Sequence, residues 1–211
     1  MTEPLDFIYR RRSIRKFSDQ PVSQADLDQL LKAAMAAPTA MNARPWEFVV
    51  VTDPEVIRKI GNSLIFGNHH PAAVIAVCGS TGVAKNLATG YFWVQDCSAA
   101  MQNILLAATA LNLGSVWVGV HPIRSFVRSI SHILNLPKRI TPLGLVYLGH
   151  PAEQKPARSQ YDEKRVHWQI YEQPQKRSIW QLFHREGMAP DGEESTPAGL
   201  DVELPEEIKE L

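Results

Sequence analysis

Residues 91–111 form the longest helical pattern in the chain, and apolar side chains cover most of its circumference. One stripe at helical spacing comprises Trp93, Cys97, Ala100, Ile104, Ala108 and Leu111, and Met101, Leu105 and Leu106 widen it to the side. A helix with so little polar surface is buried on more than one side. We therefore expect one side to pack on a sheet and the other to meet a second subunit.

The rest of the chain alternates between helix and strand signals. Helices are predicted over residues 2–9, 23–37, 53–64, 91–111 and 122–136, and strands over 46–52, 72–78, 115–120 and 142–149. A capping box from Ser23 to Asp26 begins one helix, and Asp53 followed by Pro54 begins the next. The alternation indicates an α/β sandwich. No internal repeat is present and no G-x-G-x-x-G follows a strand, which argues against a Rossmann site.

Charge is distributed unevenly along the 211 residues. Residues 1–171 carry 18 Lys and Arg against 12 Asp and Glu, whereas residues 172–211 carry 4 against 10, so a body of +6 precedes a tail of −6. We expect one domain over 1–171 and an acidic, partly flexible extension over 172–211, in which Trp180 to Phe183 docks on the body or on a partner. A mildly basic body suits a small anionic ligand better than nucleic acid.

Several features exclude other classes of site. Cys78 and Cys97 lie in apolar surroundings without a C-x-x-C motif, which favours buried thiols of a reducing compartment. No apolar leader or membrane-spanning stretch is present, so we expect a cytoplasmic protein with no membrane partner. His69 and His70 are adjacent but the other histidines are scattered, so no metal site is predicted. The segment 79–85 departs from the phosphate-loop pattern and is expected to be a strand exit.

The most basic stretch of the chain runs from Ile8 to Phe17. Within it Arg11, Ser13 and Arg15 alternate with other residues, so an extended backbone places two guanidinium groups and a hydroxyl on one side. Such a group matches a phosphate or an amide edge. The same run is also typical of a solvated surface or of a nucleic-acid patch, and the run alone does not decide between these readings.

Two further positions have more than one interpretation. Asn42 lies in a loop between a helix that stops before Pro38 and the strand that starts at Trp46, and it is either a ligand contact or a turn residue. Gly119 lies within the strand 115–120, where a glycine marks either a bulge or a close backbone approach to a ligand.

Four motifs in order resemble those of the nitroreductase family, the FMN-dependent homodimeric α+β enzymes. They are Arg11-Arg-Ser-Ile-Arg15, Pro38-Thr-Ala-Met-Asn-Ala-Arg-Pro-Trp46, Leu113-Gly-Ser-Val-Trp-Val-Gly119 and Gly149-His-Pro-Ala-Glu-Gln-Lys-Pro-Ala-Arg158. The resemblance implies a nitroreductase-like three-layer α/β sandwich with a central mixed sheet, built as an obligate homodimer. It also implies FMN as cofactor and NADH or NADPH as co-substrate.

The resemblance assigns the basic residues to the cofactor. Arg11 and Ser13 are implied to meet the flavin ring edge and ribityl chain, and Arg12 and Arg15 to lie toward the phosphate. Lys155 and Arg158 are implied to close on the same phosphate from the far end of the chain.

The remaining implied contacts come from two other motifs. Pro38, Thr39 and Asn42 are implied to reach the flavin from the opposite subunit. The backbone N–H of Gly119 is implied to point at flavin N5, with Trp117 and Val118 beside it and no side-chain acid or base required. Arg44 departs from the family, which usually has Gln there, and it either faces the site and favours an anionic substrate or faces solvent.

The activity implied is transfer of electrons from NAD(P)H to nitroaromatic, quinone or similar small acceptors by a ping-pong mechanism. Two alternatives share the flavin: another reaction of the same fold, such as reductive dehalogenation or ene reduction, and FMN binding without turnover. The nucleic-acid reading of the basic run lacks a recognition helix or a platform of stacked aromatics, so we expect no nucleic-acid partner.

Overall fold

The computed structural model describes residues 4–65, 67–80 and 88–171. The elements in order are α1 (Asp6–Arg10), α2 (Gln24–Met35), η1 (Ala40–Asn42), β1 (Trp46–Val51), α3 (Pro54–Asn62), β2 (Ala73–Ser80), α4 (Ala88–Ala110), β3 (Gly114–Gly119), α5 (Arg124–Ile133), β4 (Ile140–Gly149) and η2 (Glu163–Arg165). Each predicted helix and strand therefore has a counterpart, with ends shifted by a few residues.

The chain divides into two compact units, residues 1–160 and 161–211. The first unit contains every named helix and strand except the short η2 turn. The acidic extension expected over 172–211 lies outside the described residues, as does most of the segment 79–85. The boundary predicted at residue 171 stays a prediction.

The predicted caps explain where two helices begin. The Ser23 hydroxyl accepts a hydrogen bond from the Asp26 N–H at 3.1 Å and donates one to the Asp26 carboxylate at 2.7 Å. The Asp53 carboxylate accepts from the Glu55 N–H at 2.8 Å, with Pro54 in the first turn of α3. Both caps satisfy backbone donors that the first helical turn leaves unpaired.

The four strands form one sheet in the order β1-β2-β4-β3, and every neighbouring pair is antiparallel. This differs from the mixed sheet that was expected, because the order of elements along the chain does not determine strand direction. Among the described residues, parallel pairing is limited to an isolated bridge between Ser13 and Ser115. The strand β3 lies at one edge of the sheet and β1 at the other.

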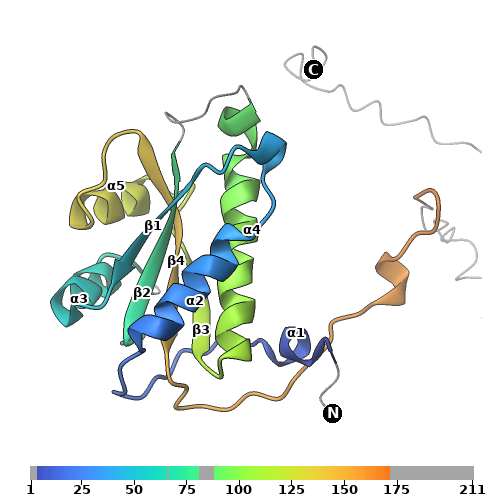
Figure 1. Cartoon of the computed structure of the whole chain (residues 1–211), viewed down its shortest axis with the longest axis horizontal. Helices are drawn as coiled ribbons and strands as arrows, with labels where there is room; N and C mark the ends of the chain where they lie inside the picture. Colours follow the sequence, from blue (N-terminus) through green and yellow to red (C-terminus); the bar gives the residue numbers. More distant parts are fainter. Residues whose placement is uncertain (1–3, 66, 81–87, 172–211) are drawn as a thin grey trace, which may run out of the picture. The chain divides into compact units, whose positions relative to one another are not determined.

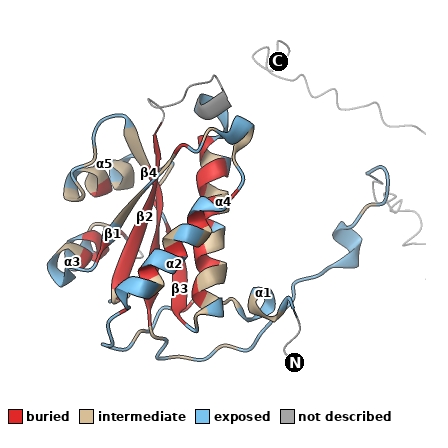
Figure 2. Ribbon diagram, in the orientation of Figure 1, coloured by how far each residue is buried: buried red, intermediate tan, exposed pale blue. Residues whose placement is uncertain are grey.

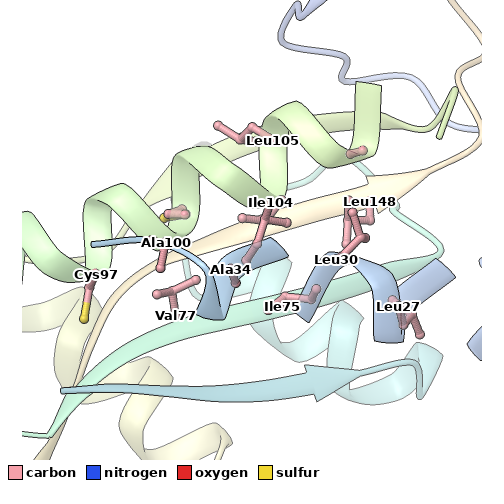
Figure 3. Packing of buried hydrophobic residues seen from close by; sticks show 14 of the residues in the cluster. Leu27, Leu30, Ala34, Ile75, Val77, Cys97, Ala100, Ile104, Leu105 and Leu148 are labelled. Carbon is pink, nitrogen blue, oxygen red and sulfur yellow. The ribbon is translucent and has the colours of Figure 1, made fainter. Parts of the chain in front are cut away.

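Helices cover both faces of the sheet, giving three layers (Figure 1). The helices α2 and α4 pack on one face and α3 and α5 on the other, each with its own apolar cluster. Because both faces are covered, β2 is buried along its whole length, and Figure 2 shows β2 and most of β4 buried. Figure 3 shows side chains of α2, among them Leu30 and Ala34, meeting those of α4 and of the sheet.

The second apolar side of α4 is partly covered by α2 of the same chain. Asn103 on α4 donates a hydrogen bond to the Ala33 carbonyl of α2 at 2.9 Å. Tyr91 and Phe92 near the start of α4 remain 78% and 47% exposed. The breadth of the apolar surface thus has an explanation within one chain, and a second subunit on this helix stays a prediction. No helix in the described ranges is long and apolar enough to cross a membrane.

Gly79 is required by the packing of the sheet against α4. A Cβ atom at this position would lie 2.2 Å from the Trp93 ring. Gly79→Ala is therefore expected to lower the free energy of unfolding by about 1–3 kcal/mol, measured by denaturant titration, because overpacking forces shifts in the core. Gly90→Ala is the matched control, since its added Cβ meets nothing within 4 Å among the described residues outside its own helical turn. Equal stability of the two variants would contradict the expectation.

Candidate functional site

The basic run lies beside the segment that follows β4, although more than 130 residues separate them in sequence. Backbone hydrogen bonds join them from Ser18 N–H to the His150 carbonyl at 2.9 Å, from Ala152 N–H to the Lys16 carbonyl at 2.9 Å, and from Arg158 N–H to the Tyr9 carbonyl at 3.1 Å. Figure 1 shows both segments running past the end of the sheet near α1. The structure therefore brings the two groups of basic residues together.

Lys155 and Glu153 connect the two segments through their side chains. The Lys155 ammonium donates to the Ser13 carbonyl at 2.6 Å and pairs with the Glu153 carboxylate at 3.1 Å. Glu153 Oε1 also accepts the backbone N–H groups of Arg15 at 2.7 Å and Lys16 at 3.3 Å. The hydrogen bond from the Arg15 N–H lowers the pKa of Glu153, and the hydrogen bond and positive charge of Lys155 lower it further.

The sequence did not assign a role to Glu153. The sequence nevertheless contains a signal, because Glu153 is an acid in a motif whose other charged residues are cations. A carboxylate there would repel a phosphate unless local partners neutralise it. The structure supplies those partners, so Glu153 fixes the shape of the basic run.

The lowered pKa of Glu153 has a consequence for stability. A carboxylate whose pKa falls on folding stabilises the protein above its unfolded pKa, and this contribution is lost as the pH drops through the folded pKa. Glu153→Gln is expected to unfold at a lower temperature than wild type at pH 7, and the difference should shrink below about pH 4. Glu55→Gln is the control, since its ion pair with Arg58 is largely exposed. A Tm difference for Glu153→Gln that does not change with pH would contradict this.

A hollow of about 550 Å³ lies beside this junction, and we call it the cationic hollow. Its lining includes Arg10, Arg12 and Lys155 together with two acids, Asp6, which pairs with Arg10, and Glu153, which pairs with Lys155. Arg12 donates to the Pro156 carbonyl and has no ion pair among the described residues. Arg11, Arg15 and Arg158 likewise form no ion pair within the described part of the chain, so their charges are available to an anion.

The outer edge of β3 is covered at one end and open at the other. Ile14 N–H donates to the Ser115 carbonyl at 2.9 Å, so the backbone groups of Ser115 point away from β4. In an antiparallel ladder this direction alternates, and the backbone N–H and C=O of Trp117 and Gly119 therefore point to the same outer edge. Gly119 is exposed, and apart from its chain neighbours no atom of the described residues lies within 4 Å of an added Cβ.

A cleft of about 260 Å³, which we call the edge cleft, lies along this open edge. It is lined by Arg15, Leu64, His69, Val116, Trp117, Val118, Gly119 and Phe126. The structure thus brings together four residues predicted from sequence: Arg15, Trp117, Val118 and Gly119. Arg12 and Lys155 line the cationic hollow instead, although Glu153 contacts both the Arg15 N–H and the Lys155 ammonium.

The edge cleft contains side chains that sequence reasoning missed, notably Leu64, His69 and Phe126. His69 was considered only as a metal ligand. Its ring meets the ring of buried Tyr147 edge-on, with centroids 6.2 Å apart, so it is held against the face of the sheet. Phe126 follows from the packing of α5 beside β3, which the sequence pattern does not reveal.

The predicted loop from Pro38 to Asn42 lies away from the edge cleft of its own chain. It leads into β1, and β1 and β3 are opposite edges of the sheet, about 14 Å apart at the usual strand spacing. Met41, Asn42 and Arg44 have positive φ angles of 51°, 52° and 48°. Such conformations cost non-glycine residues about 1–3 kcal/mol each and are concentrated at functional sites.

The buried thiols do not contribute nucleophiles. Burial raises the pKa of Cys78 and of Cys97 to about 12, so both remain protonated at neutral pH. Among the described residues, no three His, Cys, Asp or Glu side chains are grouped so that they could hold a metal ion.

These features define a three-layer α+β protein with a cleft on the open edge of its sheet and a cationic hollow nearby. The chain belongs to the nitroreductase family, whose sequence profile matches residues 8–71 and 67–150. The resemblance stated from the four motifs is therefore confirmed.

Individual proteins agree with this assignment. A protein of Archaeoglobus fulgidus, provisionally named an NADH dehydrogenase/NAD(P)H nitroreductase, is 42% identical over 172 residues, covering 79% of this chain and 98% of that protein. An FMN-dependent nitroreductase from Clostridium difficile R20291 is 30% identical with a TM-score of 0.72, covering 79% and 99% of the two chains. A protein of Desulfovibrio desulfuricans, provisionally a nitroreductase and solved with FMN, is 26% identical with a TM-score of 0.67, covering 82% and 100%.

Proposed function

We propose that the protein is an NAD(P)H-dependent flavin oxidoreductase that holds FMN along the outer edge of β3. The observation that carries the proposal is the open end of β3, where the backbone N–H and C=O of Gly119 point to the outer edge of the sheet, beside a cleft that Arg15 and Trp117 also line. The names of the relatives, which include NAD(P)H and FMN, support the same activity.

The donor set of the site fits FMN, a molecule with a dianionic phosphate at one end and a flat aromatic ring at the other. Arg12, Lys155 and Arg158 would serve the phosphate, because guanidinium and ammonium groups form charge-assisted hydrogen bonds with it. Arg11 and Ser13 belong to the same basic run, each between residues that line the cationic hollow, and would meet the ribityl chain. The edge cleft, with Trp117, Val118 and Phe126, offers the apolar surface that a ring requires.

When bound, FMN supplies the hydride chemistry, and the chain supplies position and electrostatics. The Gly119 N–H would donate a hydrogen bond to the ring nitrogen N5. The Arg15 guanidinium lines the same cleft and would stabilise negative charge on the ring. Leu64 and Phe126 would exclude water from one side of the cleft, and no side-chain acid or base is needed.

A complete site would require a second copy of the chain. Pro38, Thr39 and Asn42 approach the β1 edge, so they serve an edge cleft at β3 only if that cleft belongs to a partner subunit. A homodimer with sites at the interface accounts for their presence in the family motif. It also accounts for the exposure of Met41, an apolar residue that is 76% exposed and has an unfavourable positive φ angle.

The proposed reaction is ping-pong, with NADH or NADPH and then a nitroaromatic or quinone acceptor occupying the open side of the cleft in turn. The test is the visible spectrum of purified protein before and after anaerobic addition of NADH or NADPH, followed by the acceptor. We expect a flavin spectrum that bleaches and then returns, and parallel lines in double-reciprocal plots. A colourless protein that FMN cannot reconstitute would refute the proposal, whereas a flavin spectrum that never bleaches would indicate a binding protein.

A further inference from the structure

Asp96 is a buried acid on α4 that the proposed chemistry does not use. The residue is only 5% exposed. Its Oδ1 accepts a hydrogen bond from the Ala40 N–H at 2.9 Å, and its Oδ2 has no hydrogen-bond partner among the described residues. Burying a carboxylate with a single partner is costly, and an apolar residue of similar size is often as stable or more so. Stability alone therefore does not explain an acid here.

The hydrogen bond from the Ala40 N–H to Asp96 attaches a loop with unfavourable backbone conformations to α4, the most buried helix of the fold. Ala40 starts the η1 turn, and Thr39 makes no side-chain cap to it, so the Asp96 carboxylate takes the place of that cap. The next residues include Met41 and Asn42, both with positive φ. A loop of this kind keeps one shape only where surrounding contacts impose it.

We propose that Asp96 is a positioning residue that fixes the Thr39–Asn42 loop in the shape it presents to the FMN of a partner subunit. This rests on the proposed function, because the loop has a ligand to meet only if FMN binds at the interface. Asp96 acts through the backbone of Ala40 and does not touch the cofactor. Because Asp96 lies on the rigid helix α4, its carboxylate holds the Ala40 N–H at a fixed position, as a preorganised site requires.

The test compares FMN dissociation constants, measured by quenching of FMN fluorescence, for the full-length dimeric protein and its variants. Asp96→Ala is expected to weaken FMN binding about tenfold, as a lost hydrogen bond of this kind does. Asp96→Asn keeps an acceptor for Ala40 and should stay within about threefold of wild type. Asn103→Ala is the matched control, because it removes a different hydrogen bond between α4 and the backbone, donated by Asn103 to the Ala33 carbonyl, and it should leave FMN affinity unchanged.

A double-mutant cycle with Asn42→Ala separates positioning from general destabilisation. If Asp96 acts through the loop, the double variant should bind FMN no more than about twofold more weakly than the weaker single variant, because coupled residues are not additive. If the fold-losses in FMN affinity of the two single variants multiply in the double variant, Asp96 does not act through the loop. That result, or wild-type affinity of Asp96→Ala, would overturn the role of Asp96 and leave the proposed function standing. Wild-type protein that does not bind FMN would overturn the proposed function with it.

A second measurement covers the case in which Asp96→Ala does not fold. Folded Asp96→Asn should then retain FMN affinity and show an Ala40 amide that exchanges with solvent as slowly as in wild type. A loss of about tenfold in the FMN affinity of Asp96→Asn, or rapid exchange of the Ala40 amide in the wild-type protein, would refute the positioning role of Asp96.

Discussion

Replacing Arg15 by glutamate is expected to weaken FMN binding about 100-fold or more. Arg15 lines the edge cleft beside Trp117 and Gly119 and has no ion pair among the described residues, so its charge is available to an electron-rich ligand. The substitution removes a charge-assisted hydrogen bond and replaces attraction with repulsion, and each 1.4 kcal/mol lost is a factor of about ten in affinity. Equilibrium dialysis of FMN against the purified variant measures the change.

Arg128→Glu is the matched control for Arg15→Glu. It makes the same change of charge on an exposed position of α5 outside the edge cleft and the cationic hollow. It should bind FMN within about twofold of wild type, since exposed charges at a distance are screened by salt. Similar losses in both variants would mean that only net charge matters, and unchanged affinity of Arg15→Glu would remove Arg15 from the site.

Replacing Gly119 by valine is expected to abolish FMN binding while leaving the fold intact. An added Cβ meets no atom of the described residues within 4 Å beyond its chain neighbours, and valine is well suited to a strand, so the free energy of unfolding should change by less than about 0.5 kcal/mol. The branched side chain would occupy space beside the backbone N–H that the ring is proposed to use. Flavin content after reconstitution, with Tm measured in parallel, tests both halves.

Gly90→Ala serves as the control for Gly119→Val, because its added Cβ also meets nothing within 4 Å in the described part of the chain but lies on α4. It should keep full flavin content and gain slightly in stability, as an alanine in a helix does. A Gly119→Val variant that retains FMN would contradict the proposed position of the ring. A Gly119→Val variant that unfolds would show that the glycine is needed by the strand itself.

The boundaries of the elements were predictable because they depend on neighbours in sequence. The Ser23 and Asp53 caps, the apolar stripe of α4 and the β-branched runs act over a few residues, and each is found in the structure. The family was predictable from four short motifs whose order is a property of the chain alone. Strand direction was not, since an all-antiparallel sheet and a mixed one are compatible with the same order of elements.

The candidate site divides in the same way. Sequence supplied the basic run, Gly119 and the Pro38–Asn42 loop, because each carries a chemical signal in its residue types. It could not supply His69, Phe126 or Asp96, whose surroundings come from other elements. Glu153 has a signal in the sequence, as an acid within a basic motif, but its role depends on hydrogen bonds from the backbone of Arg15 and Lys16, which are distant in sequence.

The helices, the strands and the family follow from the amino-acid sequence, because local periodicity, capping and motif order are properties of residues that are close together along the chain. That Arg15 lines a cleft with Gly119, and Arg12 another hollow with Lys155, follows from the folded arrangement and could not be predicted from local patterns. The folded arrangement also places the loop of Asn42 at the opposite edge of the sheet from that cleft. Such proximities arise from strand order and long-range backbone pairing, which bring together residues that have no local relationship.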